Sequence, residues 1–160
     1  MTDYERALAF VLLWEGGRVD DPHDKGGRTN RGITQRTYDG WKDDHKEPHA
    51  DVWDIEDDEV MGIYRDTYWW PAAKAEWPLN LVLFDSSVLF GPGRAQEWLA
   101  AVSWHDASPV AQAWAVLCLR RELHRANIAK VKTQDLFWAG WSNRLNALAA
   151  EITKSQLIPG

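Results

Sequence analysis

The stretch that decides the fold runs from Ala7 to Thr34 and reads ALAFVLLWEGGRVDDPHDKGGRTNRGIT. Its first part is an apolar run in which Ala7, Phe10, Val11 and Trp14 recur at intervals of three and four, the spacing of an amphipathic helix. Its second part holds five glycines and one proline between residues 16 and 32, too many for a helix. The pattern predicts a helix over residues 3–15 that leads into a turn-rich loop.

Glu15 stands where the apolar run meets this loop. A carboxyl at the end of an apolar helix can be partly removed from water, and desolvation raises the pKa of a carboxyl group. A carboxyl that keeps its proton near neutral pH can act as a general acid. Cleavage of a glycosidic bond commonly needs such an acid and a second group that stabilises positive charge or activates water. Glu15 suits the first of these roles.

The loop offers candidates for the second role. Asp20, Asp21 and Asp24 are its acidic residues, and Asp24 follows Glu15 by nine positions. A hairpin that doubles back could place Asp24 across a cleft from Glu15. Thr29 follows five positions later and could orient a water molecule or a substrate hydroxyl.

Helix signals dominate the rest of the chain. Thr34 is a candidate N-cap, Pro71 ends or kinks a helix, and Ser108-Pro109 is a cap followed by proline at the first helical position. A small hairpin is expected between Arg18-Val19 and residues 31–33. Helices are expected to follow Thr34 to about residue 43 and to cover residues 58–69, 79–90, 94–102, about 109–127 and 135–152. The predicted fold class is α+β, mainly α, with a small β-hairpin lobe after the first helix.

Length and net charge limit the number of domains and the classes of partner that the chain can have. A chain of 160 residues with no linker predicts a single domain, residues 1–160. A net charge of −6 argues against nucleic acid as a partner. The N-terminus lacks the basic region and cleavage site of a signal peptide, and its apolar run is too short for membrane insertion. We expect a monomer that is made in the cytoplasm.

The loop and later segments resemble glycoside hydrolase family 108, the muramidases of phage endolysins and related bacterial proteins. The likeness covers about residues 5–75. Its motif residues are Glu15-Gly16-Gly17, Asp21-Pro22, Asp24, Gly26-Gly27, Thr29-Asn30, Gly32-Ile33-Thr34, Ile63-Tyr64-Arg65, Tyr68-Trp69 and Pro71. Residues 79–155 are similar to the segment named as a predicted peptidoglycan-binding domain in the same proteins, and here they could simply form the helical lobe of a lysozyme-like fold.

The resemblance implies a lysozyme-like fold and cleavage of the β-1,4 bond between N-acetylmuramic acid and N-acetylglucosamine in peptidoglycan. It places the family's essential glutamate on Glu15 and gives Asp24 the role of base or charge stabiliser. The wider pattern of phage lysozymes puts threonine where Asn30 stands, one position after Thr29, so the third role stays open between these two residues. Asn30, Tyr68 and Trp69 are implied substrate contacts, and Asp20 receives no catalytic role.

Metal and cofactor sites are not expected. The acidic loop departs from the EF-hand pattern at Pro22 and Lys25, and His45 and His49 lack a third ligand nearby.

Other polar and sulfur-bearing groups are assigned structural roles. Cys118 is predicted to be a buried thiol, and residues 120–125 a solvated basic helix face. Asp85 and Arg144 stand among apolar residues and are expected in a buried salt bridge or helix cap, with a substrate subsite as the second reading.

Two kinds of rival function remain beside muramidase activity. One is a non-catalytic wall-binding or particle protein on a lysozyme-like scaffold, and the presence of both Glu15 and Asp24 argues against it. The other is a chitinase or a lytic transglycosylase. Because no export signal is found, a hydrolase is expected to reach the wall by holin-type release or within a phage or gene-transfer particle.

Overall fold

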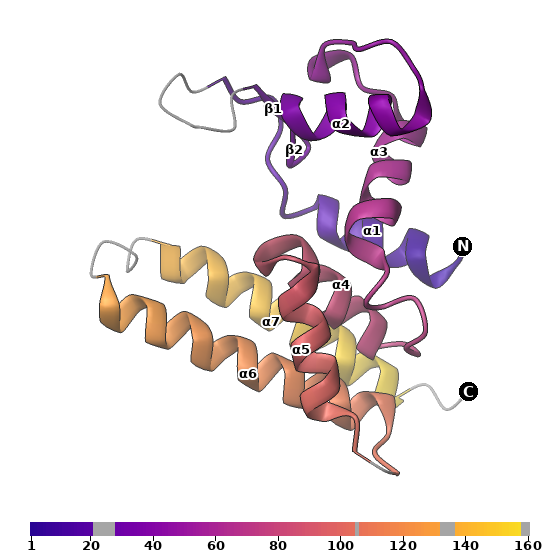
Figure 1. Cartoon of the computed structure of the whole chain (residues 1–160). Helices are drawn as coiled ribbons and strands as arrows, with labels where there is room; N and C mark the ends of the chain where they lie inside the picture. The colour runs from indigo at the N-terminus through magenta and orange to yellow at the C-terminus, as the bar shows by residue number, and fades with distance from the viewer. Residues whose placement is uncertain (21–27, 105, 132–136, 158–160) are drawn as a thin grey trace. The chain divides into compact units, whose positions relative to one another are not determined.

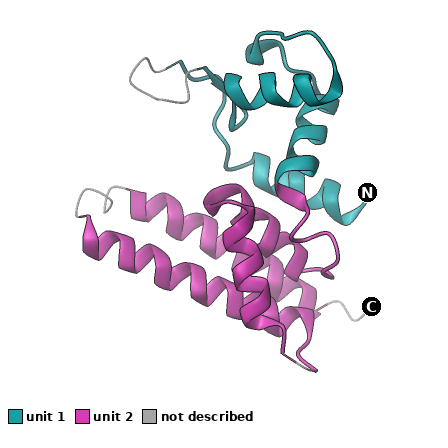
Figure 2. Ribbon diagram, in the orientation of Figure 1, with its two compact units in different colours: residues 1–67 teal, residues 68–160 magenta. Residues whose placement is uncertain are grey.

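The computed structural model describes residues 1–20, 28–104, 106–131 and 137–157. These residues are mainly helical and include one small antiparallel sheet, which confirms the predicted fold class (Figure 1). They fall into two compact units, residues 1–67 and residues 68–160 (Figure 2). The expectation of a single domain stays a prediction, and each unit is described by itself. Asp21 and Asp24 lie outside the described residues.

Unit 1 opens with helix α1, Asp3–Leu12. Thr2 and Glu5 form a capping box at its N-terminus, which satisfies backbone N–H groups that have no partner within the helix. Its buried face carries Tyr4, Ala7, Leu8 and Val11, at the predicted helical spacing. The helix ends three residues before Glu15, earlier than predicted.

The β lobe of unit 1 is a two-residue hairpin. Strand β1, Thr29–Asn30, pairs with β2, Ile33–Thr34, and Val19 forms a bridge with Thr29. A hairpin was expected between Val19 and residues 31–33. The segment of Val19 pairs instead with β1, because residues 31–32 form the turn.

Two α-helices and two short helical turns complete this part of the chain. Helix α2, Gln35–His45, begins at the predicted cap Thr34, whose side chain accepts from the Thr37 N–H. The 3-10 turn η1, Val52–Asp54, leads to helix α3, Asp57–Tyr64, whose cap is Glu56 rather than Asp57. The π-helical turn η2, Arg65–Trp69, follows α3 directly, so the element ends two residues before Pro71.

A buried charge network ties α2 to α3. The Lys42 ammonium bonds to Glu59 and, at 2.7 Å, to Glu47, and the Tyr38 hydroxyl donates to Glu59 at 2.8 Å. Burial opposes ionisation of Glu59, but hydrogen bonds from Lys42, the Glu56 N–H and Tyr38 outweigh it and lower the Glu59 pKa. The same burial, together with the Glu59 carboxylate, raises the pKa of Tyr38 to about 12.

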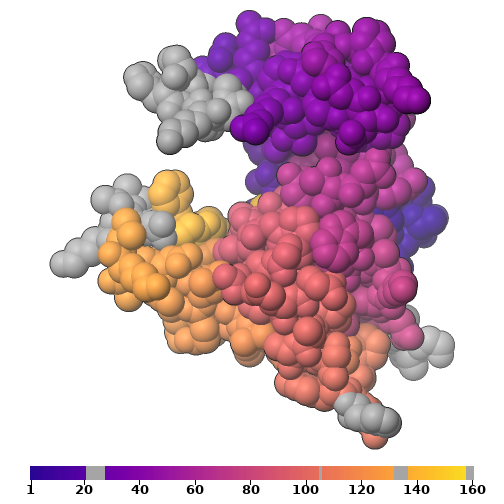
Figure 3. Space-filling model, viewed as in Figure 1, coloured from indigo at the N-terminus to yellow at the C-terminus, as the bar shows by residue number. Residues whose placement is uncertain are grey.

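Unit 2 is a bundle built around helix α4, Leu79–Phe90, in which every residue from Leu79 to Ser87 is buried. It packs against α5, Pro92–Val102, and α6, Pro109–Lys130, while α6 packs against α7, Trp138–Leu157. Helices α5 and α6 form much of the face of this unit seen in Figure 3. No helix of the described residues is long and apolar enough to cross a membrane.

The core of unit 2 encloses a charged cluster. The Asp85 carboxylate accepts from the Arg144 Nε at 2.9 Å and from Arg120, which is fully buried. A structural salt bridge or helix cap was predicted for each of Asp85 and Arg144, and the structure confirms a buried salt bridge for both and pairs them with each other. The solvated face expected for residues 120–125 is wrong at Arg120 and His124, because both side chains turn inward from α6.

Cys118 is exposed, which corrects the prediction of a buried thiol. The apolar run around it suggested burial on all sides. Helix α6 instead buries Val116, Leu117 and Arg120, so position 118 faces solvent.

Candidate active site

Glu15 lies three residues after the end of α1, at the end of a turn that continues from the helix. The Trp14 N–H donates to the Val11 carbonyl at 2.9 Å, and Glu15 stands at the next position, half-buried. Gly16-Gly17 comes directly after it, and glycine disfavours continuation of a helix. The turn carries Glu15 away from the helix axis and toward the β hairpin.

The Glu15 carboxylate rests against Gly32 in the hairpin turn. A methyl group built on Gly32 would come within 2.8 Å of Glu15 Oε2 and 2.7 Å of Tyr64 Oη. Both oxygen atoms therefore lie beside the Gly32 backbone, from two elements far apart in sequence. Only a residue without a Cβ atom permits this approach.

The hairpin turn has the conformation that brings its backbone to these side chains. Arg31 and Gly32 connect the paired residues Asn30 and Ile33, and their φ angles are 51° and 76°. Two successive positive φ angles define a type I′ turn, which matches the twist of a hairpin. The Tyr64 hydroxyl donates to the Arg31 carbonyl at 2.7 Å and anchors the turn to α3.

The other predicted site residues are distributed as follows. Thr29 is on β1, where its backbone pairs with Val19 at 2.8 Å in both directions. Asn30 is buried, and its side-chain amide donates to the Val52 carbonyl at 3.1 Å, so that amide holds the η1 turn. Asp24 falls outside the described residues.

Tyr68 and Trp69 belong to the start of unit 2 and are half-buried. The Trp69 ring meets the Phe84 ring edge to face, with 5.2 Å between centroids. Their role as substrate contacts stays a prediction.

The histidines near residue 45 have protein partners. His49 Nε2 lies 2.8 Å from Asp43 Oδ1, and this contact raises the His49 pKa. His45 Nδ1 lies 2.8 Å from the Trp41 carbonyl oxygen. Within the described part of the chain, no three His, Cys, Asp or Glu side chains gather as a metal site would require.

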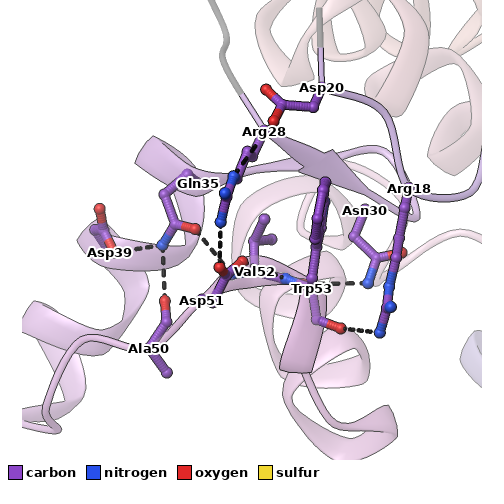
Figure 4. Close-up of polar contacts among 10 residues, drawn as sticks. All are labelled: Arg18, Asp20, Arg28, Asn30, Gln35, Asp39, Ala50, Asp51, Val52 and Trp53. Atoms are coloured by element: carbon purple, nitrogen blue, oxygen red, sulfur yellow. Dashed lines mark hydrogen bonds and ion pairs between the residues drawn. The ribbon is translucent and has the colours of Figure 1, made fainter.

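A polar groove lies beside the hairpin turn. It has a volume of about 390 Å³ and includes Arg18, Asn30, Arg31 and Trp53 in its lining. Figure 4 shows the contacts of Arg18, Asn30 and Trp53, including the hydrogen bond that the Asn30 amide donates to the Val52 carbonyl. The Val52 N–H in turn donates to Gln35 Oε1. Sequence reasoning assigned no role to Tyr64, Gly32 or this groove, although Tyr64 and Gly32 stand within the quoted motif.

The family assignment agrees with this geometry. The model of the family described as glycosyl hydrolase 108 matches residues 8–91, more than half of the chain. The chain belongs to glycosyl hydrolase family 108. The match takes in Glu15, Gly32 and Tyr64, so the carboxylate against the hairpin turn lies inside the region that defines this family.

Whole-chain similarity extends the comparison beyond the matched region. A solved structure of Brucella abortus SagA is 28% identical in sequence, and the alignment covers 94% of each chain with a TM-score of 0.65. Among curated proteins, none matches this sequence significantly. Membership of family 108 supports the assignment of the chain as a glycoside hydrolase.

Proposed function

We propose that this family 108 protein is a muramidase that hydrolyses the β-1,4 bond between N-acetylmuramic acid and N-acetylglucosamine in peptidoglycan. The observation that carries the proposal is the position of Glu15, whose carboxylate oxygen is held against Gly32 beside the Tyr64 hydroxyl. A half-buried carboxyl that lies against the backbone of a hairpin turn is suited to deliver a proton to a defined place.

Glu15 donates its proton to the oxygen that bridges the two sugars. As the bond breaks, N-acetylglucosamine leaves with the proton on its oxygen, and positive charge develops at the anomeric carbon of the N-acetylmuramic acid residue. Asp24 is proposed to stabilise this charge or to activate the attacking water. Thr29, five positions later on β1, is proposed to orient that water or a substrate hydroxyl.

The site of action is proposed to be the bacterial wall. Peptidoglycan lies outside the cytoplasmic membrane, and we propose that the protein reaches it by holin-type release or within a particle.

A lysis assay on permeabilised Gram-negative cells tests the proposal. Glu15→Gln keeps the size of the side chain and removes its acidic proton, so we expect about a thousandfold loss of lytic rate, within the range for general acid–base catalysis. Asp44→Asn is the matched control, because Asp44 is exposed on α2 in the same unit and changes charge equally. Full lysis by folded Glu15→Gln would refute the role of Glu15.

A further inference from the structure

The polar groove beside the hairpin turn is lined by charges of both signs. Arg18 and Arg31 contribute guanidinium groups, and Asp54 and Glu56 contribute carboxylates. A volume of about 390 Å³ accommodates a few residues of a polar ligand. A neutral N-acetylated sugar does not require such charges, whereas a peptide with carboxylate and ammonium groups does.

The Trp53 ring contacts the guanidinium groups of two arginines in this region. The guanidinium carbons of Arg28 and Arg18 lie 4.6 Å and 5.9 Å from the centroid of its ring (Figure 4). Sugars in glycosidase clefts commonly stack on open aromatic faces, and here guanidinium groups occupy the space over the ring. Trp53 therefore positions cations, and its carbonyl also accepts from Arg18 Nη2 at 2.6 Å.

The three arginines differ in how their charge is balanced. Arg28 pairs with Asp51 and, at 3.5 Å, with Asp20, and Arg31 pairs with the exposed Asp57. Arg18 is exposed and forms no ion pair with any carboxylate among the described residues. Arg18 is thus a positioned cation whose charge is available to a ligand.

Two residues that line the groove are close along the chain to Glu15 or to the glycine that its carboxylate contacts. Arg18 follows Glu15 by three positions, and Arg31 directly precedes Gly32, on which the Glu15 carboxylate rests. A group attached to the sugar at the cleavage point would reach the groove without a long spacer. In peptidoglycan that group is the stem peptide on muramic acid, which carries carboxylates and an ammonium.

We infer that this groove binds the stem peptide of peptidoglycan, with Arg18 holding a peptide carboxylate and Asp54 and Glu56 facing the ammonium. The inference rests on the proposed function for its substrate. It makes the enzyme selective for peptide-bearing glycan over bare glycan, and it makes Arg18 a specificity determinant.

Calorimetric binding to the full chain carrying Glu15→Gln tests this inference without turnover. One probe is the disaccharide with its tetrapeptide, and the other is the same disaccharide after an amidase has removed the peptide. The peptide-bearing probe should bind at least about tenfold tighter, since a charge-assisted hydrogen bond is among the stronger polar contacts. Arg18→Gln should abolish that difference.

Matched variants separate recognition from folding. Glutamine at position 18 keeps a donor for the Trp53 carbonyl, so the fold should persist, and a thermal melt checks it. Arg36→Gln removes the same charge from an exposed position on α2 outside the groove and should leave the preference intact. Arg18→Lys keeps the charge without the planar fork and should retain part of the preference.

Two results would overturn the inference: equal binding of both probes, or a preference that Arg18→Gln leaves unchanged. Dependence on Arg18 that is strongest for the amidase-treated probe would show recognition of the lactyl carboxylate instead of the peptide, and this too would overturn it. If peptide binding depends on Arg18 but the wild-type chain cleaves no glycan, only the proposed function fails.

Discussion

At the scale of single residues, Gly32 is as informative as Glu15. The carboxylate of Glu15 and the hydroxyl of Tyr64 both approach the space that a Gly32 side chain would fill. Glu15 could be singled out from sequence, because a carboxyl between an apolar run and a glycine-rich loop is a local pattern. Its neighbour Tyr64 could not be found in the same way, because their proximity depends on how α3 packs against the hairpin.

Replacement of Gly32 by alanine should damage the site more than the fold. The new methyl group would meet Glu15 and Tyr64 at under 3 Å, and the φ of 76° costs a non-glycine residue about 1–2 kcal/mol. We expect lytic activity to fall at least tenfold and unfolding free energy to fall by about 1–3 kcal/mol. Gly40→Ala on α2, where nothing lies within 4 Å, should keep full activity and tends to raise stability.

Chemical denaturation and lysis rates of the two glycine variants measure these effects side by side. An active Gly32→Ala protein of normal stability would contradict the close approach of the Glu15 carboxylate.

At the scale of elements, the sequence patterns located most helices and misjudged some of their faces. The cap residues Thr34 and Ser108 were predictable because capping is a local hydrogen bond, and each accepts from the N–H three residues on. The inward orientation of the Arg120 side chain was not predictable, since a basic residue on a helix ordinarily faces solvent. Its burial depends on Asp85, which belongs to another helix.

The Asp85 cluster should be essential to unit 2. Asp85→Ala leaves Arg120 and Arg144 buried without their carboxylate. Because breaking a buried ion pair is strongly destabilising, we expect the free energy of unfolding to fall by about 3–5 kcal/mol. Glu97→Gln removes a carboxylate from the exposed pair with Arg94 and should change stability by less than about 1 kcal/mol. Urea unfolding of both variants checks the contrast, and equal small losses would contradict the buried network.

His124 should make the protein sensitive to mild acid. Burial, with a smaller effect of the Arg120 charge, lowers the His124 pKa from 6.5 to about 4. Between these values the unfolded chain binds a proton that the folded chain does not, so stability is full above pH 6.5 and falls as the pH drops toward 4.

Thermal melts at pH 7 and pH 5 test this effect, with His124→Phe as the comparison. Phenylalanine can occupy the space between the Phe90 and Trp141 rings and does not titrate. The wild type should lose more stability than the variant on going to pH 5. An identical loss in both proteins would assign the acid sensitivity to other groups.

At the scale of the whole molecule, helix periodicity and cap residues along the chain predicted a mainly α fold. The similarity to Brucella abortus SagA extends over 94% of the chain. The division into two compact units after residue 67 could not be predicted, because the amino-acid composition does not change there. No linker marks the boundary, because the π-helical turn η2 continues from α3 across it.

Net charge makes a prediction about activity. The chain carries a charge of −6, and peptidoglycan is also anionic, so long-range repulsion should slow their encounter at low salt. Raising sodium chloride from about 10 mM to about 150 mM shortens the Debye length from roughly 30 Å to 8 Å and should increase the initial rate of lysis. A rate that falls steadily over this range would show that local positive charge dominates binding.

The most direct test of the central claim is the product of peptidoglycan digestion in water enriched with oxygen-18. If Glu15 protonates the bridging oxygen and water completes the reaction, mass spectrometry should show muropeptides with a reducing N-acetylmuramic acid that carries one oxygen-18 atom, and Glu15→Gln should yield none. Products with a 1,6-anhydro end and no label, or labelled products from the Glu15→Gln protein at the wild-type rate, would contradict the account.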